Sequence, residues 1–287
     1  MTQSDAHEQS TNTYFVEAES SAEMARLIDQ DRIFTKAMGG LFSEQEDLST
    51  IVDVLDVACG PGGWVLDVAR HYPDMEVTGI DVSKIMIEYA STYAQVRKLP
   101  NAHFQMMNAL EPLQFPDASF DLVNARTIAG FVFPSVWSKL LAECKRILRP
   151  GGILRLTEPE WGFANKPAFE TYCALVNRAL FLSGRSFSPT GKHIGIHPLL
   201  KHLLVDAGFS SVDIKAHVLD YSAGVVAHHS MYDDCVIGFK LLQPFMVASG
   251  VGTQEEIEQL YDQAMNEMHL DDFYGILYLL TAWGVVA

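Results

Sequence analysis

Basic side chains are scarce in this sequence. It contains 20 lysines and arginines against 36 aspartates and glutamates, a formal net charge of −16 at pH 7. Nucleic-acid binding needs a basic face that neutralises phosphates, and an anionic membrane surface attracts the same kind of face. The sequence therefore predicts no nucleic-acid partner and no membrane partner. It favours a neutral or cationic small molecule as the ligand.

Cysteines and long apolar runs are also scarce. The four cysteines lie far apart and form no C-x-x-C pair, so we expect no disulfide framework and no metal site. No stretch reaches the roughly 18 apolar residues of a transmembrane helix. The polar residues 1–12 lack the basic and apolar parts of a signal or transit peptide. These absences predict a soluble, cytoplasmic protein.

Apolar residues, by contrast, are plentiful. They make up 48% of the 287 residues and charged residues make up 20%, which is typical of a globular chain with a buried core. We expect residues 1–12 to be a disordered tail and residues 13–50 to form an N-terminal helical lid. Residues 51–287 then form the main domain, with helical insertions on the substrate side at about 160–197 and 222–270.

Strands and helices alternate through the first part of this domain. Apolar patterns predict strands over 51–58, 75–80, 102–107, 120–125 and 153–157, with helices over 63–71, 83–97 and 137–148 between them. Such alternation gives a parallel sheet covered by helices on both faces. After residue 158 the alternation breaks. The apolar run 273–285 is predicted to be a closing strand, with a terminal helix as the alternative.

A glycine-rich turn follows the first predicted strand. The backbone at Gly60 and Gly62 can approach a ligand closely, because no Cβ blocks the way. The second strand ends in Asp81, and a carboxylate at the tip of that strand suits the two hydroxyls of a ribose. The pattern therefore predicts a pocket for a cofactor that contains adenosine. The alternative for Asp81 is a carboxylate that only stabilises the start of the next helix.

The spacing of the glycines narrows the kind of cofactor. A dinucleotide fingerprint has the form G-x-G-x-x-G/A, and here Val65 stands where the third small residue is needed. No lysine follows in the spacing of a phosphate-binding P-loop. The turn therefore favours neither a dinucleotide nor a phosphate cradle.

Residues 54–64, with the sequence VLDVACGPGGW, resemble motif I of the class I S-adenosylmethionine-dependent methyltransferases, usually written LDxGxGxG. Three further motifs follow in the family's order: GIDVS at 79–83, FPDASFDLV at 115–123 and LRPGG at 148–152. The resemblance runs from about residue 51 to residue 158, and it is to the small-molecule, UbiE-like group of the family. It departs from the family's pattern at Ala58, which stands where the first glycine is common.

The resemblance implies a Rossmann-like α/β fold with a seven-stranded, mostly parallel sheet, and S-adenosylmethionine as the cofactor. It implies that Gly60 and Gly62 pass under the methionine part and that Asp81 binds the ribose. Asn108 stands where the family contacts the adenine, commonly with an aspartate. Asp56 either orders the glycine turn or reaches the ammonium group of the cofactor. The full set of implied cofactor contacts is Tyr14, Asp56, Ala58, Gly60, Gly62, Asp81, Val82, Met86, Asn108, Ala109, Leu110, Asn124 and Ala125.

Methyl transfer requires a nucleophile held in line and the exclusion of water. An acceptor hydroxyl or ammonium group also needs a base. The candidates are Glu158, which follows the fifth predicted strand, and His193 and His229, which lie in the predicted substrate-side segments. Each has the alternative of being a hydrogen-bonded or surface side chain. No spacing indicates a nucleophile triad or a metal site, so neither a covalent nor a metal-assisted mechanism is expected.

Taken together, these features predict a methyltransferase that uses S-adenosylmethionine and a small-molecule substrate. The methyl group would pass in line to an O, N or C nucleophile in a closed pocket. One alternative is a cofactor-binding protein of the same fold with other chemistry, and another is a non-catalytic partner protein. We expect a monomer or a homodimer.

Overall fold

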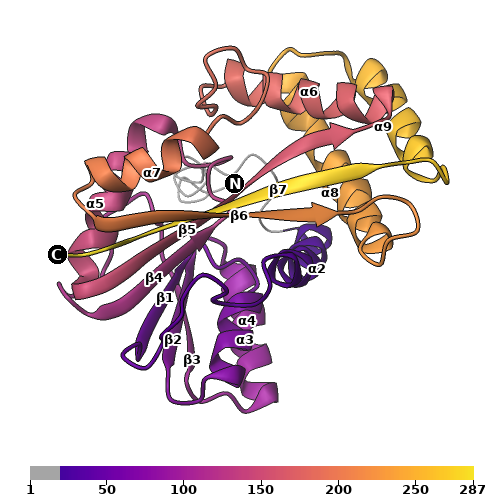
Figure 1. Ribbon diagram of the computed structural model, residues 1–287. Helices are drawn as coiled ribbons and strands as arrows, with labels where there is room; N and C mark the ends of the chain where they lie inside the picture. Colours follow the sequence, from indigo (N-terminus) through magenta and orange to yellow (C-terminus); the bar gives the residue numbers. More distant parts are fainter. Residues whose placement is uncertain (1–19) are drawn as a thin grey trace, which may run out of the picture.

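Seven strands form one sheet in the computed structural model, which describes residues 20–287 (Figure 1). The strands are β1 (Asp53–Val57), β2 (Glu76–Asp81), β3 (Ala102–Met106), β4 (Phe120–Arg126), β5 (Leu148–Ala164), β6 (Ser210–Asp220) and β7 (Gly275–Val285). Their order is β3-β2-β1-β4-β5-β7-β6, with β1 to β5 parallel and β7 antiparallel to both its neighbours. The predicted α/β fold with a mostly parallel sheet is confirmed.

Helices cover both faces of the sheet. They are α2 (Ser21–Ala37), α3 (Gly63–His71), α4 (Lys84–Arg97), the 3₁₀ helix η1 (Pro134–Val136), α5 (Trp137–Ile147), α6 (Pro167–Leu182), α7 (His197–Asp206), α8 (His228–Ala248) and α9 (Gln254–Met268). In Figure 1, α3 and α4 lie on one face, and α5 and α7 lie on the other. The helices α6, α8 and α9 gather around the outer ends of β5 and β7, where α2 packs against α8.

The first strand shows how the sheet divides the core. Val54 is fully buried in a cluster with Val65 and Val68 of α3. Leu55, the next residue, is fully buried in a different cluster, which includes Leu141 of α5. Successive side chains of a strand point to opposite faces, so a strand covered on both faces appears as a continuous apolar run in the sequence. This is why residues 51–58 were predictable as a strand.

The apolar run near the C-terminus forms β7. The predicted closing strand is confirmed, and the helical alternative is wrong. Strand β7 lies between β5 and β6, so neighbours on both sides satisfy its backbone groups. Strand β5 continues well past its predicted end at residue 157, because it stays paired with β7 as far as Ala164 opposite Gly275. These long strands extend the sheet to the helices α6, α8 and α9.

Helix α2 is the helical part of the predicted N-terminal lid within the described residues. The side chain of Ser20 caps it by accepting a hydrogen bond from the backbone N–H of Glu23 at 3.4 Å. The predicted tail at residues 1–12 and the first residues of the lid lie outside the described residues. The domain boundaries stay predictions, as do the two insertions, although α6 lies within the first segment and α8 and α9 lie within the second.

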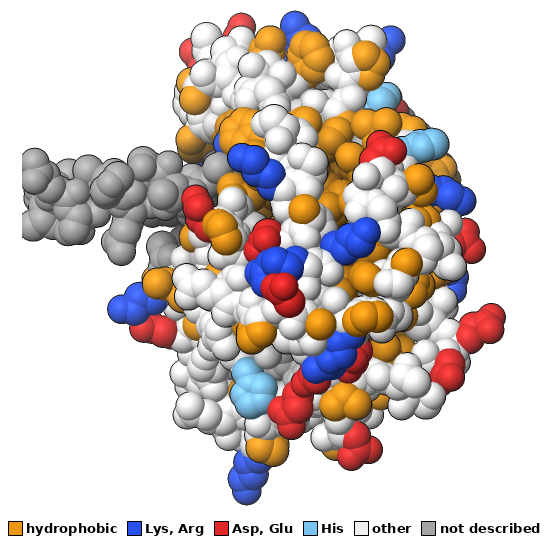
Figure 2. All heavy atoms as spheres, turned by 90° about the vertical axis from the view of Figure 1, so that its left-hand side faces the viewer, with side chains coloured by type: hydrophobic (Ala, Val, Ile, Leu, Met, Phe, Trp, Pro, Cys, Tyr) orange, Lys and Arg blue, Asp and Glu red, His pale blue; other side chains and the backbone are white. Residues whose placement is uncertain are grey.

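Within residues 20–287, no helix combines the length and the apolar composition needed to span a bilayer. The same residues contain no group of three or more His, Cys, Asp or Glu side chains placed to hold one metal ion. On the face seen in Figure 2, lysine and arginine side chains are scattered among aspartates and glutamates and do not gather into one patch.

Candidate active site

A cavity, here named cavity 1, opens beside the glycine turn at the carboxyl ends of β1, β2 and β4. Eight of the predicted cofactor contacts line it: Asp56, Ala58, Gly60, Asp81, Val82, Met86, Asn108 and Ala109. Four others, Gly62, Leu110, Asn124 and Ala125, are not part of its lining. Tyr14 falls outside the described residues. The fold thus brings most of the predicted residues, which are far apart in the sequence, to one place.

Asp81 ties the glycine turn to the end of β2. Its Oδ2 accepts a hydrogen bond from the backbone N–H of Gly60 at 2.9 Å, and its Oδ1 accepts one from the backbone N–H of Ser83 at 2.9 Å. Ser83 in turn caps α4, its side chain accepting from Met86 N–H at 3.3 Å. Asp81 also lines cavity 1, where a ligand can approach its carboxylate. The structural and the ligand-binding interpretations of Asp81 are therefore compatible.

The glycine turn has left-handed backbone at three positions. The φ angles are 56° at Ala58, 54° at Gly60 and 78° at Gly62. A Cβ on Gly62 would lie 2.6 Å from the ring of Phe104 and 2.9 Å from Cβ of Ala90, so Gly62 allows close packing beneath the turn. A Cβ on Gly60 would meet only Leu27, at 3.6 Å. Gly60 therefore leaves cavity 1 open, whereas Gly62 brings α4 and β3 up to the turn.

Asp56 is a buried carboxylate that a chain of hydrogen bonds from β4 and β5 holds in place. Its Oδ1 accepts a hydrogen bond from Asn124 Nδ2 at 2.7 Å, and Asn124 Oδ1 accepts one from Arg155 Nη1 at 2.7 Å. Arg155 forms an ion pair with Glu44, in which both side chains are fully buried. Burial raises the pKa of Asp56 to about 7, against the opposing effects of Arg126 and Asn124. Asn124 therefore orients Asp56 at the floor of cavity 1.

Two more predicted residues outside the lining have local roles. Leu110 donates its backbone N–H to Asn108 Oδ1 at 3.0 Å, so Asn108 closes its own loop while lining cavity 1. Ala125 is buried in the core of β4. Asparagine is common in turns because its side chain can bond to the nearby backbone in this way. The bond from Leu110 uses only Oδ1 of Asn108, so the amide N–H groups of Asn108 are left for a ligand.

One face of α2 closes cavity 1 from the other side. Its residues Leu27, Gln30, Asp31 and Phe34 line the cavity, and Asp31 pairs with Arg126 at the end of β4. These four residues were not among the predicted cofactor contacts. The signal was present, because these four positions have the spacing of one face of a helix. What the sequence could not reveal was the surface against which that face packs.

A second cavity, cavity 2, adjoins the first. It is about 160 Å³ in volume, against about 140 Å³ for cavity 1. Five residues line both cavities: Leu27, Gln30, Phe34, Thr127 and Phe131. The rest of the cavity 2 lining comes mainly from α6, α8 and the ends of β5 and β7, and it is largely apolar and aromatic, including Trp161, Phe169, Tyr221 and Phe239. The five shared residues form what we call the boundary between the cavities.

Glu158 is the predicted catalytic residue that lines cavity 2. Its Oε1 accepts a hydrogen bond from Ile128 N–H at 2.9 Å, and its Oε2 accepts one from Ala129 N–H at 3.1 Å. Burial raises the pKa of Glu158 to about 8, although these two N–H groups lower it. A carboxyl with such a pKa can hold or release a proton near neutral pH.

The two predicted histidines lie elsewhere. Neither His193 nor His229 lines cavity 1 or cavity 2. The side chain of His229 is 87% exposed and lies 3.5 Å from Asp233 on the surface of α8. The carbonyl of His193 accepts a hydrogen bond from Ser186 Oγ at 3.1 Å. The fold therefore does not bring these histidines together with Glu158.

Thr127 occupies a strained position on the boundary. Its φ is 59°, in the left-handed region that β-branched residues rarely adopt. Its backbone N–H donates to Thr157 at 2.9 Å, and its hydroxyl donates to the carbonyl of Arg126 at 2.7 Å. The Glu158 carboxylate holds the next two residues. Strain of this kind persists only where the surroundings enforce it, and it gathers at functional sites.

Comparison with known proteins agrees with this architecture. A family model described as a methyltransferase domain matches residues 54–152. A demethylmenaquinone methyltransferase of Listeria welshimeri is 30% identical over 190 residues, which cover 62% of this chain and 76% of the relative. The chain belongs to the class I methyltransferases that use S-adenosylmethionine. This confirms the family, the enzyme class and the cofactor expected from the motifs.

Two other members of this methyltransferase family are informative. Methyltransferase str2 of Strobilurus tenacellus is 31% identical over 163 residues, and the match covers 55% of this chain and 54% of str2. This chain therefore spans only about half of that relative. The crystal structure of YcgJ from Bacillus subtilis superposes with a TM-score of 0.55 at 18% identity, covering 88% of this chain and 99% of YcgJ. This likeness supports the fold.

The polar and charged side chains that line cavity 1 of this methyltransferase fit S-adenosylmethionine. The Asp81 carboxylate is the kind of group that binds the two hydroxyls of a ribose, and Asn108 has amide groups for the adenine edge. Asp56 and Arg126 supply charges of opposite sign, which suits the ammonium and carboxylate groups of the cofactor's amino-acid end. The open backbone at Gly60 leaves room beside them.

Proposed function

We propose that this chain transfers a methyl group from S-adenosylmethionine in cavity 1 to a small molecule in cavity 2. The observation that carries the proposal is the boundary of five residues shared by the two cavities. In-line methyl transfer needs donor and acceptor in adjoining sites with no solvent layer between them. Two cavities of similar size with a common wall provide that arrangement.

The residues of cavity 1 would hold the cofactor by the groups described above, with Asp81 at the ribose and Asp56 at the amino-acid end. When bound, S-adenosylmethionine supplies a methyl group on a positively charged sulfur, which a nucleophile can attack. Leu27 and Phe34 of α2, together with Phe131, are the apolar residues of the boundary. They would exclude water from the acceptor's nucleophilic atom, because a hydrated nucleophile attacks poorly.

Glu158 is our candidate for the group that accepts a proton from an acceptor O–H or N–H. It lines cavity 2, and each of its oxygens retains an acceptor position beside the bond from Ile128 or Ala129. A pKa of about 8, raised by burial, makes the ionised form available in mildly basic solution. His193 and His229 stay candidates only if their segments move towards the cavities.

Calorimetric titration with S-adenosylmethionine and with S-adenosylhomocysteine tests the donor site. We expect both to bind, and Asp81→Ala to weaken both by roughly 100-fold, because two hydrogen bonds to a charged group and the turn they support are lost. Asp262→Ala, at an exposed position of α9, is the matched control and should leave binding unchanged. Binding that is indifferent to Asp81 contradicts the proposed site.

Incubation with methyl-labelled S-adenosylmethionine and a metabolite extract tests the reaction. We expect mass spectrometry to find a product that carries the label, and Glu158→Gln to slow its formation by 100-fold or more, within the usual range for loss of a general base. Cofactor binding without any labelled product would instead favour a protein of this fold with other chemistry or a partner role.

A further inference from the structure

The boundary between the cavities contains two polar residues, Gln30 and Thr127, among three apolar ones. Thr127 has already committed its hydroxyl hydrogen to the carbonyl of Arg126, at 2.7 Å. Its oxygen can therefore only accept a further hydrogen bond. The question for ligand recognition is which group Gln30 presents to the boundary.

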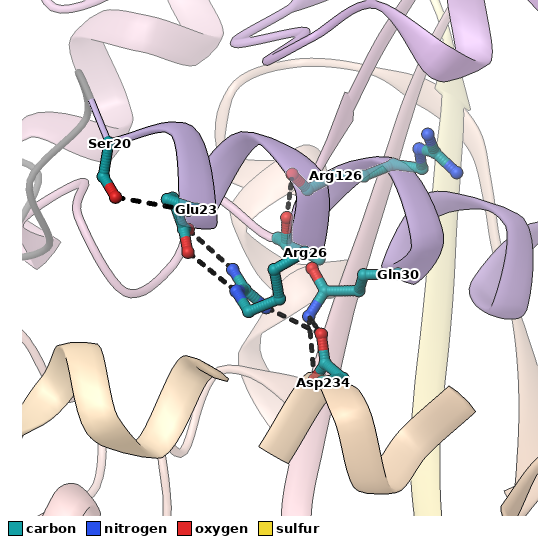
Figure 3. A network of polar contacts seen from close by, with 7 residues as sticks. Ser20, Glu23, Arg26, Gln30, Arg126 and Asp234 are labelled. Carbon is teal, nitrogen blue, oxygen red and sulfur yellow. Dashed lines mark hydrogen bonds and ion pairs between the residues drawn. The ribbon is translucent and has the colours of Figure 1, made fainter. Parts of the chain in front are cut away.

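Asp234 of α8 fixes the orientation of the Gln30 amide. Gln30 Nε2 lies 3.2 Å from Asp234 Oδ1 and 3.4 Å from Oδ2, and Arg26 Nη1 donates to the same Oδ1 at 2.9 Å (Figure 3). Arginine can only donate, so Oδ1 is an acceptor and the facing atom of Gln30 must be its N–H₂ group. The carbonyl oxygen Oε1 then points away from Asp234, as Figure 3 shows.

Gln30 Oε1 accepts no hydrogen bond from any residue in the described range 20–287. Gln30 also lines both cavities. Together with the Thr127 oxygen, it makes the boundary a place with hydrogen-bond acceptors and no free side-chain donor. A ligand that reaches the boundary must supply the donor, because an unpaired carbonyl oxygen in a closed site costs free energy.

The charged residues of cavity 2 are directed towards one another or towards the backbone. Arg26 donates to Glu23 at 2.7 Å through both Nε and Nη2, and to Asp234 through Nη1 (Figure 3). Glu158 is held by two backbone N–H groups. The lining of cavity 2 thus contains three carboxyl groups and one guanidinium, and that guanidinium is already paired with Glu23 and Asp234, which disfavours an anionic ligand. A cationic ligand would find Glu23 and Asp234 already paired with Arg26, and Glu158, whose pKa burial raises to about 8, largely protonated at pH 7, so burying the charge of the ligand would be costly.

The remaining lining of cavity 2 favours rings. The ring of Phe169 packs against those of Phe239 and Tyr221, with centroid distances of 5.6 Å and 6.2 Å, and Trp161 lines the same space. Aromatic side chains attract flat apolar ligands through a large contact area and preferred ring geometries. Polar recognition is therefore concentrated at the boundary, and the rest of the cavity supplies apolar contact.

We propose that cavity 2 takes a neutral, ring-containing apolar molecule with one O–H or N–H group, and that Gln30 Oε1 accepts this group's hydrogen bond at the boundary. The inference rests on the proposed function, since it treats cavity 2 as the acceptor site. Gln30 thereby becomes a specificity residue that selects acceptors with a donor hydrogen and holds the nucleophilic atom beside cavity 1 in the bound state, before the proton of this group passes to Glu158.

Three naphthalene probes of similar size test the proposal by calorimetry: 1-naphthol, which has the donor, 1-methylnaphthalene, which lacks it, and 1-naphthoate, which is anionic. We expect 1-naphthol to bind and 1-naphthoate to bind at least tenfold more weakly. In Gln30→Leu the affinity ratio of 1-naphthol to 1-methylnaphthalene should fall about fivefold, the worth of one neutral hydrogen bond. Gln30→Met gives a second variant with an unbranched side chain, in case the leucine variant does not fold.

Gln263→Leu, the same change at an exposed position of α9, should keep the wild-type ratio. An unchanged ratio in both Gln30 variants overturns the role of Gln30. Tight binding of 1-naphthoate, or no binding of any probe, overturns the ligand class. S-adenosylhomocysteine is titrated into the same samples. Its failure to bind contradicts the proposed function, whereas normal cofactor binding with the wrong probe pattern contradicts this inference alone.

Discussion

At the scale of single residues, Ala58 shows the cost of the family's missing glycine. Its φ of 56° lies in the left-handed region, which a Cβ makes unfavourable by roughly 1 kcal/mol. We expect Ala58→Gly to raise the free energy of unfolding by up to about 1 kcal/mol, since the strain relieved exceeds the added chain entropy. Denaturant unfolding measures this. Ala69→Gly, inside α3, should lower stability by about 1 kcal/mol. The same sign for both changes contradicts the prediction.

Glu158 gives a prediction for the pH dependence of stability. Burial raises its pKa to about 8, from 4.5 in an unfolded chain, so the folded state binds the proton more tightly. This contribution is complete below pH 4.5 and is lost as the pH rises through 8. Asp56, whose pKa burial raises to about 7, acts in the same direction. The free energy of unfolding should therefore fall as the pH rises from about 5 to 8. The slope is about 1.4 kcal/mol per pH unit for each carboxyl that loses its proton when the chain unfolds.

The variant Glu158→Gln isolates the part due to this carboxyl. Its unfolding free energy, measured in denaturant across the same pH range, should fall less steeply than that of the wild type, because the glutamine has no proton to release. The Asp56 contribution is present in both proteins and cancels in the difference. Parallel curves would show that Glu158 does not titrate in this range.

The residues that could be predicted from the sequence share one property. Asp81 ends β2 and Gly60 follows β1, each within a local motif, so their place in the chain fixes their place at the edge of the sheet. Gln30 and Thr127 could not be found in this way. Gln30 reaches the boundary only because α2 packs against α8, and Thr127 depends on a buried carboxylate 31 residues from it for the shape of its turn.

At the scale of elements, a buried ion cluster joins α2 to α8. Arg26 is the cation shared by Glu23 and Asp234, and its side chain is 11% exposed. Removing a partner from a buried cluster leaves a charge without compensation, so Arg26→Ala should cost about 3–5 kcal/mol and speed hydrogen exchange in α2. Arg32 on the same helix pairs with Asp29 in solvent, at 61% and 65% exposure. Arg32→Ala should change stability by less than about 0.5 kcal/mol.

The spacing of apolar residues predicted whether most segments are helices or strands, but it did not predict the full length or the position of each. The strands up to residue 125 were recognisable from local apolar runs. The full length of β5 was not, because its last part depends on hydrogen bonds with β7, more than 100 residues away. The positions of α6, α8 and α9 over cavity 2 likewise depend on packing between distant segments. The helix or strand propensity of a local segment does not depend on partners that are distant in the sequence, so it cannot predict them.

At the scale of the whole molecule, α2 links the two cavities. It supplies Asp31 to cavity 1, Arg26 to cavity 2 and Gln30 to both, so either ligand binds best when the helix is seated. Two ligands that favour the same conformation must favour each other by equal factors. We expect S-adenosylhomocysteine to tighten 1-naphthol binding by up to about fivefold in the wild type, and 1-naphthol to tighten S-adenosylhomocysteine binding equally.

A variant that weakens the packing of α2 tests this coupling between the cavities more strictly. In Arg26→Ala the seated state is less populated, so each ligand alone binds more weakly and the first to bind recovers more for the second. The coupling factor, measured by calorimetry with each ligand in the presence and absence of the other, should therefore be larger in Arg26→Ala than in the wild type. Arg32→Ala should keep the wild-type factor, since its ion pair lies in solvent. A coupling factor that falls or stays constant in Arg26→Ala would mean that the cavities communicate by a route other than α2.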